Sequence, residues 1–226
     1  MTTPRVAIVD YGVGNLFSVA QACTRVGLAA EITGDASRIA TADGIILPGV
    51  GAFGFAMAQL QNLQIVDVIN NAVARDVPLM GVCLGFQLLF ETSEEMGANK
   101  GLGYIPGHVA PLQQAIRRTS TTDTVRSPNV GWLAVNKPHN KSNQDCWQST
   151  PMQNVTEATR MYFVHSYFAE PTDANDNLAE AEYYGMKFCC AVNRGKIFGC
   201  QFHPEKSDAE GLKIYASFAS AINPLT

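Results

Sequence analysis

The sequence predicts an α/β protein with an open, mostly parallel, doubly wound sheet, helices on both faces and an added region of antiparallel strands. In the first half, short apolar segments alternate with segments of helical periodicity. The apolar segments are continuous, which is typical of parallel strands buried on both faces. In the second half, strand-like segments are joined by polar turns, which indicates antiparallel pairing.

The first half contains four segments with the apolar character of buried strands. They are residues 5–10, 29–33, 44–49 and 78–83. Helices are expected between and after them, at residues 15–27, 63–75 and 84–91. Gly27 ends the first helix, since glycine is favoured just past a helix C-terminus. Because strands and helices alternate, neighbouring strands are expected to run parallel.

The second half is expected to add strands at the edge of this sheet. The strand-like segments are residues 107–113, 130–135, 161–169 and 178–184. Residues 187–203 have the pattern of a hairpin with its turn at the Asn-Arg-Gly of 193–195, and a final helix is expected over about 208–222. Residues 137–160 are polar and rich in Pro and Asn, so we interpret them as a surface insert. The whole of residues 1–226 is therefore expected to form one domain.

The composition excludes several kinds of partner. With 226 residues, 46 % of them hydrophobic and 16 % charged, the chain can bury a sizeable core. The formal net charge is −4 without a basic block, so neither nucleic-acid nor membrane-surface binding is indicated. The N-terminus lacks an apolar signal region and no stretch is long enough to span a bilayer, so a cytoplasmic location is expected.

The six cysteines do not indicate disulfides or structural zinc. They form no C-x-x-C pair and no two-His-two-Cys spacing, so a structural metal is not expected. Most are expected to be small, buried apolar residues. They are Cys23, Cys83, Cys146, Cys189, Cys190 and Cys200. Nucleophilic catalysis by a cysteine and a histidine, the chemistry considered for Cys83, needs no metal or organic cofactor.

Cys83 differs from the others because it ends an apolar strand and begins a helix-like segment. Open α/β sheets bind ligands at this edge, and G-V-C-L-G has the layout of a nucleophile elbow with cysteine in place of serine. Gly81 and Gly85 suit a tight turn. The helix N-terminus favours the thiolate, and the N–H of Leu84 can stabilise an oxyanion. The alternative is a buried structural cysteine.

A candidate base follows a later apolar strand. A thiolate needs an imidazole to carry its proton, and the imidazole needs an acceptor that fixes its tautomer. His203 and Glu205 are two residues apart, with Pro204 between them, and would point the same way in extended backbone. His165 is the rival base, and a surface histidine beside a helix-capping glutamate is the non-catalytic alternative.

Together, G-V-C-L-G-F-Q (81–87) and Q-F-H-P-E (201–205) resemble the motifs of class I glutamine amidotransferases. Further segments are similar to the glutaminase subunit of imidazole glycerol phosphate synthase. They are residues 10–19, 47–57, 81–95, 162–167 and 199–212, and they extend from end to end of the chain.

The resemblance implies hydrolysis of L-glutamine to glutamate and ammonia by Cys83, His203 and Glu205. It implies that the N–H of Val50 or Gly51 joins the N–H of Leu84 in an oxyanion hole. It also implies a set of substrate-binding positions, with Gln87 at the amino-acid end of glutamine. The set is Gly49, Gln87, His165, Ser166 and Tyr167.

The resemblance further implies a heterodimer with a TIM-barrel cyclase. This partner uses the ammonia to make imidazole glycerol phosphate and aminoimidazole carboxamide ribotide in histidine biosynthesis. The matching interface positions are Asn15, Trp132 and Lys206. A core role for Trp132 and a solvated Lys206 are the alternatives.

One segment departs from the family pattern Pro-His-x-Gly-Trp-Asn. This chain has P-N-V-G-W-L at residues 128–133, with Asn129 in place of His and Leu133 in place of Asn. The departure leaves open a paralogous glutaminase that supplies ammonia to another acceptor, such as a sugar-amidation enzyme. The sequence is also compatible with a non-catalytic binding module and with a different cysteine hydrolase on a similar sheet.

Overall fold

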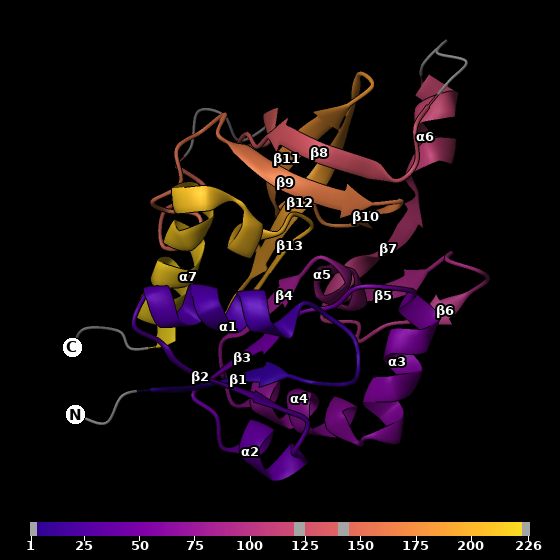
Figure 1. The fold of residues 1–226 in the computed structure, drawn as a ribbon. Helices are drawn as coiled ribbons and strands as arrows, with labels where there is room; N and C mark the ends of the chain where they lie inside the picture. Colours follow the sequence, from indigo (N-terminus) through magenta and orange to yellow (C-terminus); the bar gives the residue numbers. More distant parts are fainter. Residues whose placement is uncertain (1–3, 120–124, 140–144, 223–226) are drawn as a thin grey trace.

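The computed structural model describes residues 4–119, 125–139 and 145–222 (Figure 1). Within them, an eleven-stranded sheet has the order β2-β1-β3-β4-β13-β12-β10-β7-β5-β6, with β11 paired to β12. The strands from β2 to β13 in this order are all parallel, which confirms the predicted core. They are β1 (Arg5–Val9), β2 (Ala29–Thr33), β3 (Gly44–Leu47), β4 (Leu79–Val82) and β13 (Ile197–Cys200).

The remaining strands of the sheet pair mostly antiparallel, although β5 and β7 are parallel. The predicted hairpin is present as β12–β13, with Arg194 opposite Ile197. The antiparallel region is thus attached to the parallel core through β13. Its strands are β5 (Phe90–Ser93), β6 (Asn99–Lys100), β7 (Ile105–Pro111), β10 (Tyr167–Pro171), β11 (Asn177–Tyr183) and β12 (Met186–Arg194).

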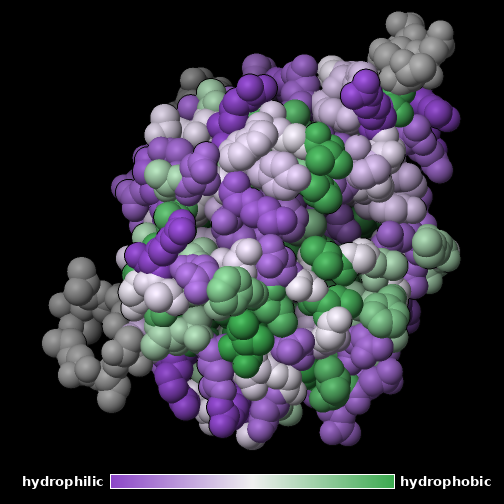
Figure 2. Space-filling view, in the orientation of Figure 1, coloured by the Kyte–Doolittle hydropathy of each residue, from purple (hydrophilic) through white to green (hydrophobic). Residues whose placement is uncertain are grey.

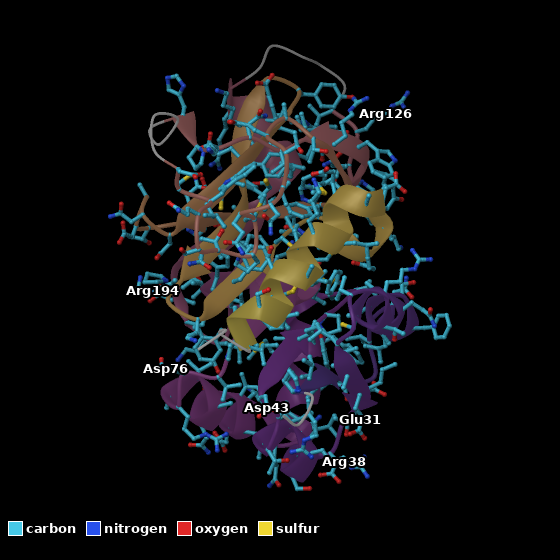
Figure 3. All side chains as sticks on the ribbon, turned by 90° about the vertical axis from the view of Figure 1, so that its left-hand side faces the viewer. Glu31, Arg38, Asp43, Asp76, Arg126 and Arg194 are labelled. Atoms are coloured by element: carbon cyan, nitrogen blue, oxygen red, sulfur yellow. The ribbon has the colours of Figure 1, made fainter. Side chains whose placement is uncertain are left out.

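Helices cover both faces of the parallel strands, as expected. On one face, α1 (Leu16–Arg25) and α7 (Asp208–Ile222) lie side by side and bury apolar side chains against the sheet (Figures 1 and 3). The other face is covered by α2 (Ala36–Ala40), α3 (Phe53–Asn62), α4 (Ile65–Ala74) and α5 (Leu84–Leu88). At the outer edge, β2 carries an ion pair between Glu31 and Arg38 (Figure 3). None of the helices in the described ranges is long and apolar enough to cross a membrane.

Some helix boundaries differ from the prediction. The sequence pattern did not predict α2 or α3, and the helix expected at 63–75 begins at Ile65. The helix expected at 84–91 ends at Leu88. It ends there because the carbonyl oxygens of Leu88 and Leu89 accept hydrogen bonds from the N–H groups of Leu102 and Tyr104, at 2.8 and 2.9 Å. The strand expected at 107–113 ends at Pro111 and continues as α6 (Leu112–Thr119).

The single strand expected at 161–169 is two strands in different sheets. The first, β9 (Arg160–His165), pairs with β8 (Asn129–Ala134) in a separate two-stranded sheet, and the second, β10, enters the main sheet. Ser166 lies between them. The chain therefore bends at 165–167, and this bend forms one wall of the site described below.

The insert at 137–160 is more than a surface loop in its described part. Trp147, Met152 and Val155 are buried in the core on the α1 and α7 side of the sheet. The indole N–H of Trp147 donates to the carbonyl oxygen of Leu178 at 2.8 Å. The insert is therefore packed onto the antiparallel strands by apolar burial, which its polar composition does not indicate. Residues 140–144 lie outside the described residues.

Candidate active site

Cys83 lies at the bend between β4 and α5, with φ 56° and ψ −109°. Positive φ is unfavourable for any residue with a Cβ, and strained backbone of this kind is common at functional sites. A Cβ on Gly85 would lie 1.7 Å from the carbonyl oxygen of Leu47, and one on Gly81 would lie 2.8 Å from the carbonyl oxygen of Gly85. Only glycine fits at both positions, so the tight elbow predicted from the sequence is present.

His203 and Glu205 meet beside this elbow. The Nδ1 of His203 is 2.8 Å from the Oε1 of Glu205, and both side chains are almost fully buried. Residues Pro204–Lys206 form a 3-10 turn rather than extended backbone, and the turn brings the carboxylate back onto the imidazole. The imidazole also interacts with the Cys83 sulfur. The structure therefore brings together the three residues of the predicted triad.

The protonation of His203 is set by two opposing effects. Burial alone would lower its pKa, but the hydrogen bonds to Cys83 and Glu205, together with their charges, raise the pKa to about 10. An imidazolium next to the sulfur favours the thiolate, which is the attacking form of cysteine. The helix dipole contributes less than expected from the sequence, because α5 has only five residues.

His165, the rival base, has both ring nitrogens engaged elsewhere. Its Nδ1 lies 2.8 Å from the carbonyl oxygen of Tyr167, which can only accept, so Nδ1 carries the hydrogen. The amide of Asn129 then donates to Nε2 at 2.9 Å. Burial lowers the pKa of His165 to about 4, although the hydrogen bond to Tyr167 acts in the opposite direction. His165 is therefore neutral near pH 7 and poorly placed to accept a proton from Cys83.

A cavity of about 200 Å³ opens in front of the Cys83 sulfur. Its walls come from the end of β3, the elbow, the bend at 165–167 and the loop after β13. The residues that line it are Val50, Gly51, Cys83, Leu84, Gln87, Glu95, Pro128, Val164, His165, Ser166, Tyr167 and His203. Among the described residues, no three His, Cys, Asp or Glu side chains gather closely enough to hold a metal ion.

Two hydrogen bonds fix the side chain of Gln87 in the cavity wall. Its side-chain amide donates to the carbonyl oxygen of Tyr167 at 3.1 Å and to the Oε1 of Gln201 at 2.8 Å. The amide of Gln201 in turn lies 3.9 Å from the Cys83 sulfur. Gln201 was not singled out from the sequence, although it lies in the Q-F-H-P-E motif.

Glu95 is a second residue that sequence reasoning missed. It lines the cavity, and its Oε2 accepts a hydrogen bond from the backbone N–H of Phe53 at 2.6 Å. This bond joins the Glu95 segment to the N-terminus of α3. The only signal in the sequence is that Glu95 lies within the segment 81–95 that resembles the family.

The predicted oxyanion hole is occupied by a backbone carbonyl. The N–H of Leu84 donates to the carbonyl oxygen of Gly49 at 3.4 Å. The peptide between Gly49 and Val50 therefore presents its oxygen, not its N–H, to the position where an oxyanion would lie. The next residue, Gly51, has φ +102°. The predicted donors surround the cavity, but one of their peptides faces the wrong way for catalysis.

The three predicted interface residues do not line the cavity, but they lie close to segments that do. Trp132, 39 % exposed, contacts the ring of Tyr162 edge-on at 5.8 Å. The ammonium of Lys206 lies 5.8 Å from the centre of the same ring. Asn15 begins α1, and a Cβ on the preceding Gly14 would lie 3.8 Å from the Cα of Gly49. Figure 2 shows apolar surface in the middle of this face, over and beside α1.

The fold and the site together define a class I glutamine amidotransferase. The model of the family described as "Glutamine amidotransferase class-I" matches residues 7–220. The structure of PurLQS from Thermotoga maritima superposes with a TM-score of 0.69 at 21 % identity, over 98 % of this chain and 100 % of the other. A glutamine amidotransferase from the same organism gives a TM-score of 0.65 at 14 % identity, over 100 % of both chains. These two neighbours share the fold.

Sequence relatives identify the family within the class I glutamine amidotransferases. A protein from Moorella thermoacetica is 41 % identical over 96 % of this chain and 95 % of its own length. One from Rhodopirellula baltica is 40 % identical over 96 % and 97 %, and one from Chlorobaculum tepidum is 39 % identical over 95 % and 98 %. All three are named imidazole glycerol phosphate synthase subunit HisH. This chain belongs to the HisH family.

Proposed function

We propose that this chain is the glutaminase subunit of an imidazole glycerol phosphate synthase. It hydrolyses L-glutamine to glutamate and ammonia and passes the ammonia to a cyclase subunit that makes imidazole glycerol phosphate and aminoimidazole carboxamide ribotide in histidine biosynthesis. The observation that carries the proposal is the buried Cys83–His203–Glu205 set beside a cavity at the carboxyl edge of the sheet. The HisH relatives support a cyclase of imidazole glycerol phosphate synthase as the acceptor of the ammonia.

In the proposed reaction, the Cys83 thiolate attacks the side-chain amide carbon of glutamine. His203 gives its proton to the departing ammonia, which leaves a glutamyl thioester on Cys83. The neutral imidazole then removes a proton from water, the resulting hydroxide attacks the thioester, and the sulfur leaves as thiolate. Glu205 holds Nδ1 of His203, so that the other ring nitrogen faces the sulfur and the imidazolium is stabilised.

The amino-acid end of glutamine is held on the side of the cavity away from His203. We assign Gln87 and the backbone of residues 165–167 to this end, as the family resemblance implies. We add Glu95, because a carboxylate in the cavity wall complements the α-ammonium group of the substrate. The brace from Gln201 and Tyr167 fixes the side chain of Gln87 before the substrate arrives.

The isolated chain is expected to be a poor glutaminase. With the Gly49 carbonyl on the Leu84 N–H, the oxyanion hole lacks a donor and carries an opposing dipole. Loss of one such donor reduces kcat by roughly 10²–10³-fold. Rotation of the Gly49–Val50 peptide would bring an N–H into the hole, and the flanking glycines permit both orientations. Binding of the cyclase beside Asn15, Trp132 and Lys206 is proposed to favour the active orientation.

The partner is proposed to be a TIM-barrel cyclase that forms a heterodimer with this chain in the cytoplasm. No nucleic acid or membrane is involved in the proposed assembly. Ammonia is lost to solvent as ammonium unless an acceptor is in place, so control of hydrolysis by the partner has a clear benefit.

The test is release of glutamate by the pure chain, and then by the chain with the cyclase and its ribonucleotide substrate. Strong stimulation supports both the switch and the partner, and Cys83→Ala is the inactive control. Full activity of the chain alone would show that the proposed switch does not exist. Stimulation by a sugar-amidating enzyme but not by the cyclase would identify the paralogous function instead. No glutamate release in any mixture would leave a non-catalytic module.

A further inference from the structure

Glu205 uses only one of its two carboxylate oxygens on His203. Oε1 lies 2.8 Å from Nδ1 of His203. Oε2 is buried and makes no well-formed hydrogen bond with any described residue. A buried carboxylate oxygen without a donor is unfavourable, so a donor that reached Oε2 would help to fix the orientation of Glu205.

A second buried polar group without a hydrogen bond, the hydroxyl of Tyr215, lies next to the turn that carries Glu205. Tyr215 belongs to α7, is fully buried and likewise makes no well-formed hydrogen bond through its hydroxyl to the described residues. It lies within hydrogen-bonding reach of the Glu205 carboxylate, although the alignment is imperfect. Burial, followed by the charge of Glu205, raises the pKa of Tyr215 well above its usual value, so the hydroxyl keeps its proton. The Tyr215 hydroxyl is therefore an unpaired donor, and Oε2 of Glu205 is an unpaired acceptor.

The sequence brings these groups together through a close contact between α7 and the turn that carries Glu205. A Cβ on Gly211 would lie 2.0 Å from the carbonyl oxygen of Pro204, so only glycine allows the approach. Gly211 lies one helical turn before Tyr215 and therefore on the same face of α7. The hydroxyl of Ser207 donates to the carbonyl oxygen of His203 at 2.7 Å and fixes the turn against the helix.

Two thiols also face this region, and neither can replace the hydroxyl. Cys23 comes from α1 and Cys200 from β13, and both interact electrostatically with Tyr215. Burial raises the pKa of Cys23 to about 12 and that of Cys200 well above its usual value, so both are neutral. The thiol of Cys200 contacts the carbonyl oxygen of Phe202 at 3.6 Å, and thiols are weak donors. On its other oxygen, Glu205 contacts His203, which in turn interacts with Cys83.

We propose that Tyr215 is a positioning residue of the glutaminase reaction, whose hydroxyl donates to Oε2 of Glu205 when the site is active. This bond holds the carboxylate in place against His203. The inference rests on the proposed glutaminase function and extends the chain of contacts from Cys83 through His203 and Glu205 into α7.

The first test is Tyr215→Phe, assayed with the cyclase present. We expect kcat to fall about tenfold, as for loss of a hydrogen bond to a charged group, while the KM for glutamine stays unchanged. Wild-type protein without glutaminase activity would contradict the proposed function; an active wild type with an unaltered Tyr215→Phe would contradict only the role of Tyr215.

A matched control is Tyr104→Phe, which removes a hydroxyl bonded to the Oδ1 of Asn70 at 2.6 Å outside the site. It should leave both kcat and the KM for glutamine unchanged. The second test combines Tyr215→Phe with Glu205→Gln. If Tyr215 acts through Glu205, the double variant is no slower than Glu205→Gln alone; additive losses would show a separate structural role. A double-mutant cycle of the same variants, measured by urea unfolding, gives the coupling free energy between the two positions even where kcat is too low to measure. Absence of coupling would overturn the proposal.

Discussion

Replacement of Gly85 by alanine tests whether the position of the elbow against β3 limits the reaction. An added Cβ would lie 1.7 Å from the carbonyl oxygen of Leu47 and 2.7 Å from its carbonyl carbon. Since Cβ contacts below 3.0 Å are essentially never observed, the Cβ–oxygen distance must grow from 1.7 Å to at least 3.0 Å. Both partners are backbone, so a rotamer change cannot relieve the clash.

The displacement falls on the groups that we propose to form the oxyanion hole. Gly85 follows Leu84, and Leu47 lies two residues before Gly49, so the Leu84 N–H and the Gly49 peptide move apart. A misplacement of about 1 Å can reduce the rate by about 10²-fold. Overpacking of this kind costs about 1–3 kcal/mol of stability, compared with about 5–15 kcal/mol for a typical protein. We expect a folded protein with kcat reduced about 10²-fold.

The assay is glutamate release at saturating glutamine with the cyclase present, together with urea unfolding of each variant. The matched control is Gly185→Ala in the β11–β12 turn, where φ is +78° and no atom lies within 4 Å of the added Cβ. It introduces the strain of a left-handed alanine, about 1–2 kcal/mol, without moving the site. Wild-type kcat in folded Gly85→Ala would show that the elbow geometry does not limit the reaction.

Three further predictions concern the triad and its rival histidine. Cys83→Ala should abolish glutamate release and leave the fold intact, and a glutamine-derived affinity label should modify Cys83 alone; mass spectrometry that finds the label on another cysteine would remove the assignment. Glu205→Gln should reduce kcat by roughly 10³–10⁴-fold, and His203→Asn should be inactive, whereas His165→Asn should lose far less; the opposite order of the two histidine variants would make His165 the base. Because the pKa of His165 is lowered from 6.5 to about 4 in the folded protein, its contribution to the free energy of unfolding is complete above pH 6.5 and is lost as the pH falls toward 4. Urea unfolding at pH 7 and pH 5 should therefore show a loss of stability at pH 5 that is smaller in His165→Asn.

The central parallel strands β1, β3 and β4 were predictable because each is a continuous, buried apolar segment, whereas the edge strand β2 is mostly exposed and carries Glu31. The sequence also contains a signal for α3: Phe53, Ala56, Met57 and Leu60 are all buried and have helical spacing. The signal is hard to recognise because it begins inside the glycine-rich segment 47–57, which has the pattern of a strand followed by a turn. For α2, the side chain of Asp35 accepts from the N–H of Ser37 at 2.8 Å, a common N-cap arrangement.

The break at Ser166 could not be predicted from local pattern. Both β9 and β10 are rich in apolar and aromatic residues, and they differ only in the strands with which they pair. Pairing partners are set by the tertiary fold. The bend that results places His165, Ser166 and Tyr167 at the cavity, so a wall of the site depends on information that the segment itself does not contain.

The candidate site residues that could be predicted are those in local sequence motifs. Cys83, His203 and Glu205 lie in short motifs whose chemistry can be read from neighbouring residues. The roles of Gln201 and Tyr215 arise from contacts across the fold: Gln201 accepts from a side chain 114 residues earlier in the chain, and Tyr215 reaches Glu205 from a different helix. Such contacts leave no local signature.

The structure also weakens the argument that the departure from the family pattern at residues 128–133 indicates a different ammonia acceptor. Asn129 and Leu133 were expected to show a changed partner, because they lie beside Trp132 in the sequence. Instead Asn129 is 1 % exposed and donates to His165, and Leu133 packs against the core. Side chains alternate along β8, so Trp132 and Val130 face outward while the two altered positions face inward. Asn129 therefore supports the neutral His165 of its own chain and Leu133 belongs to the core packing. The outward-facing residues of β8 give no reason to prefer a different ammonia acceptor.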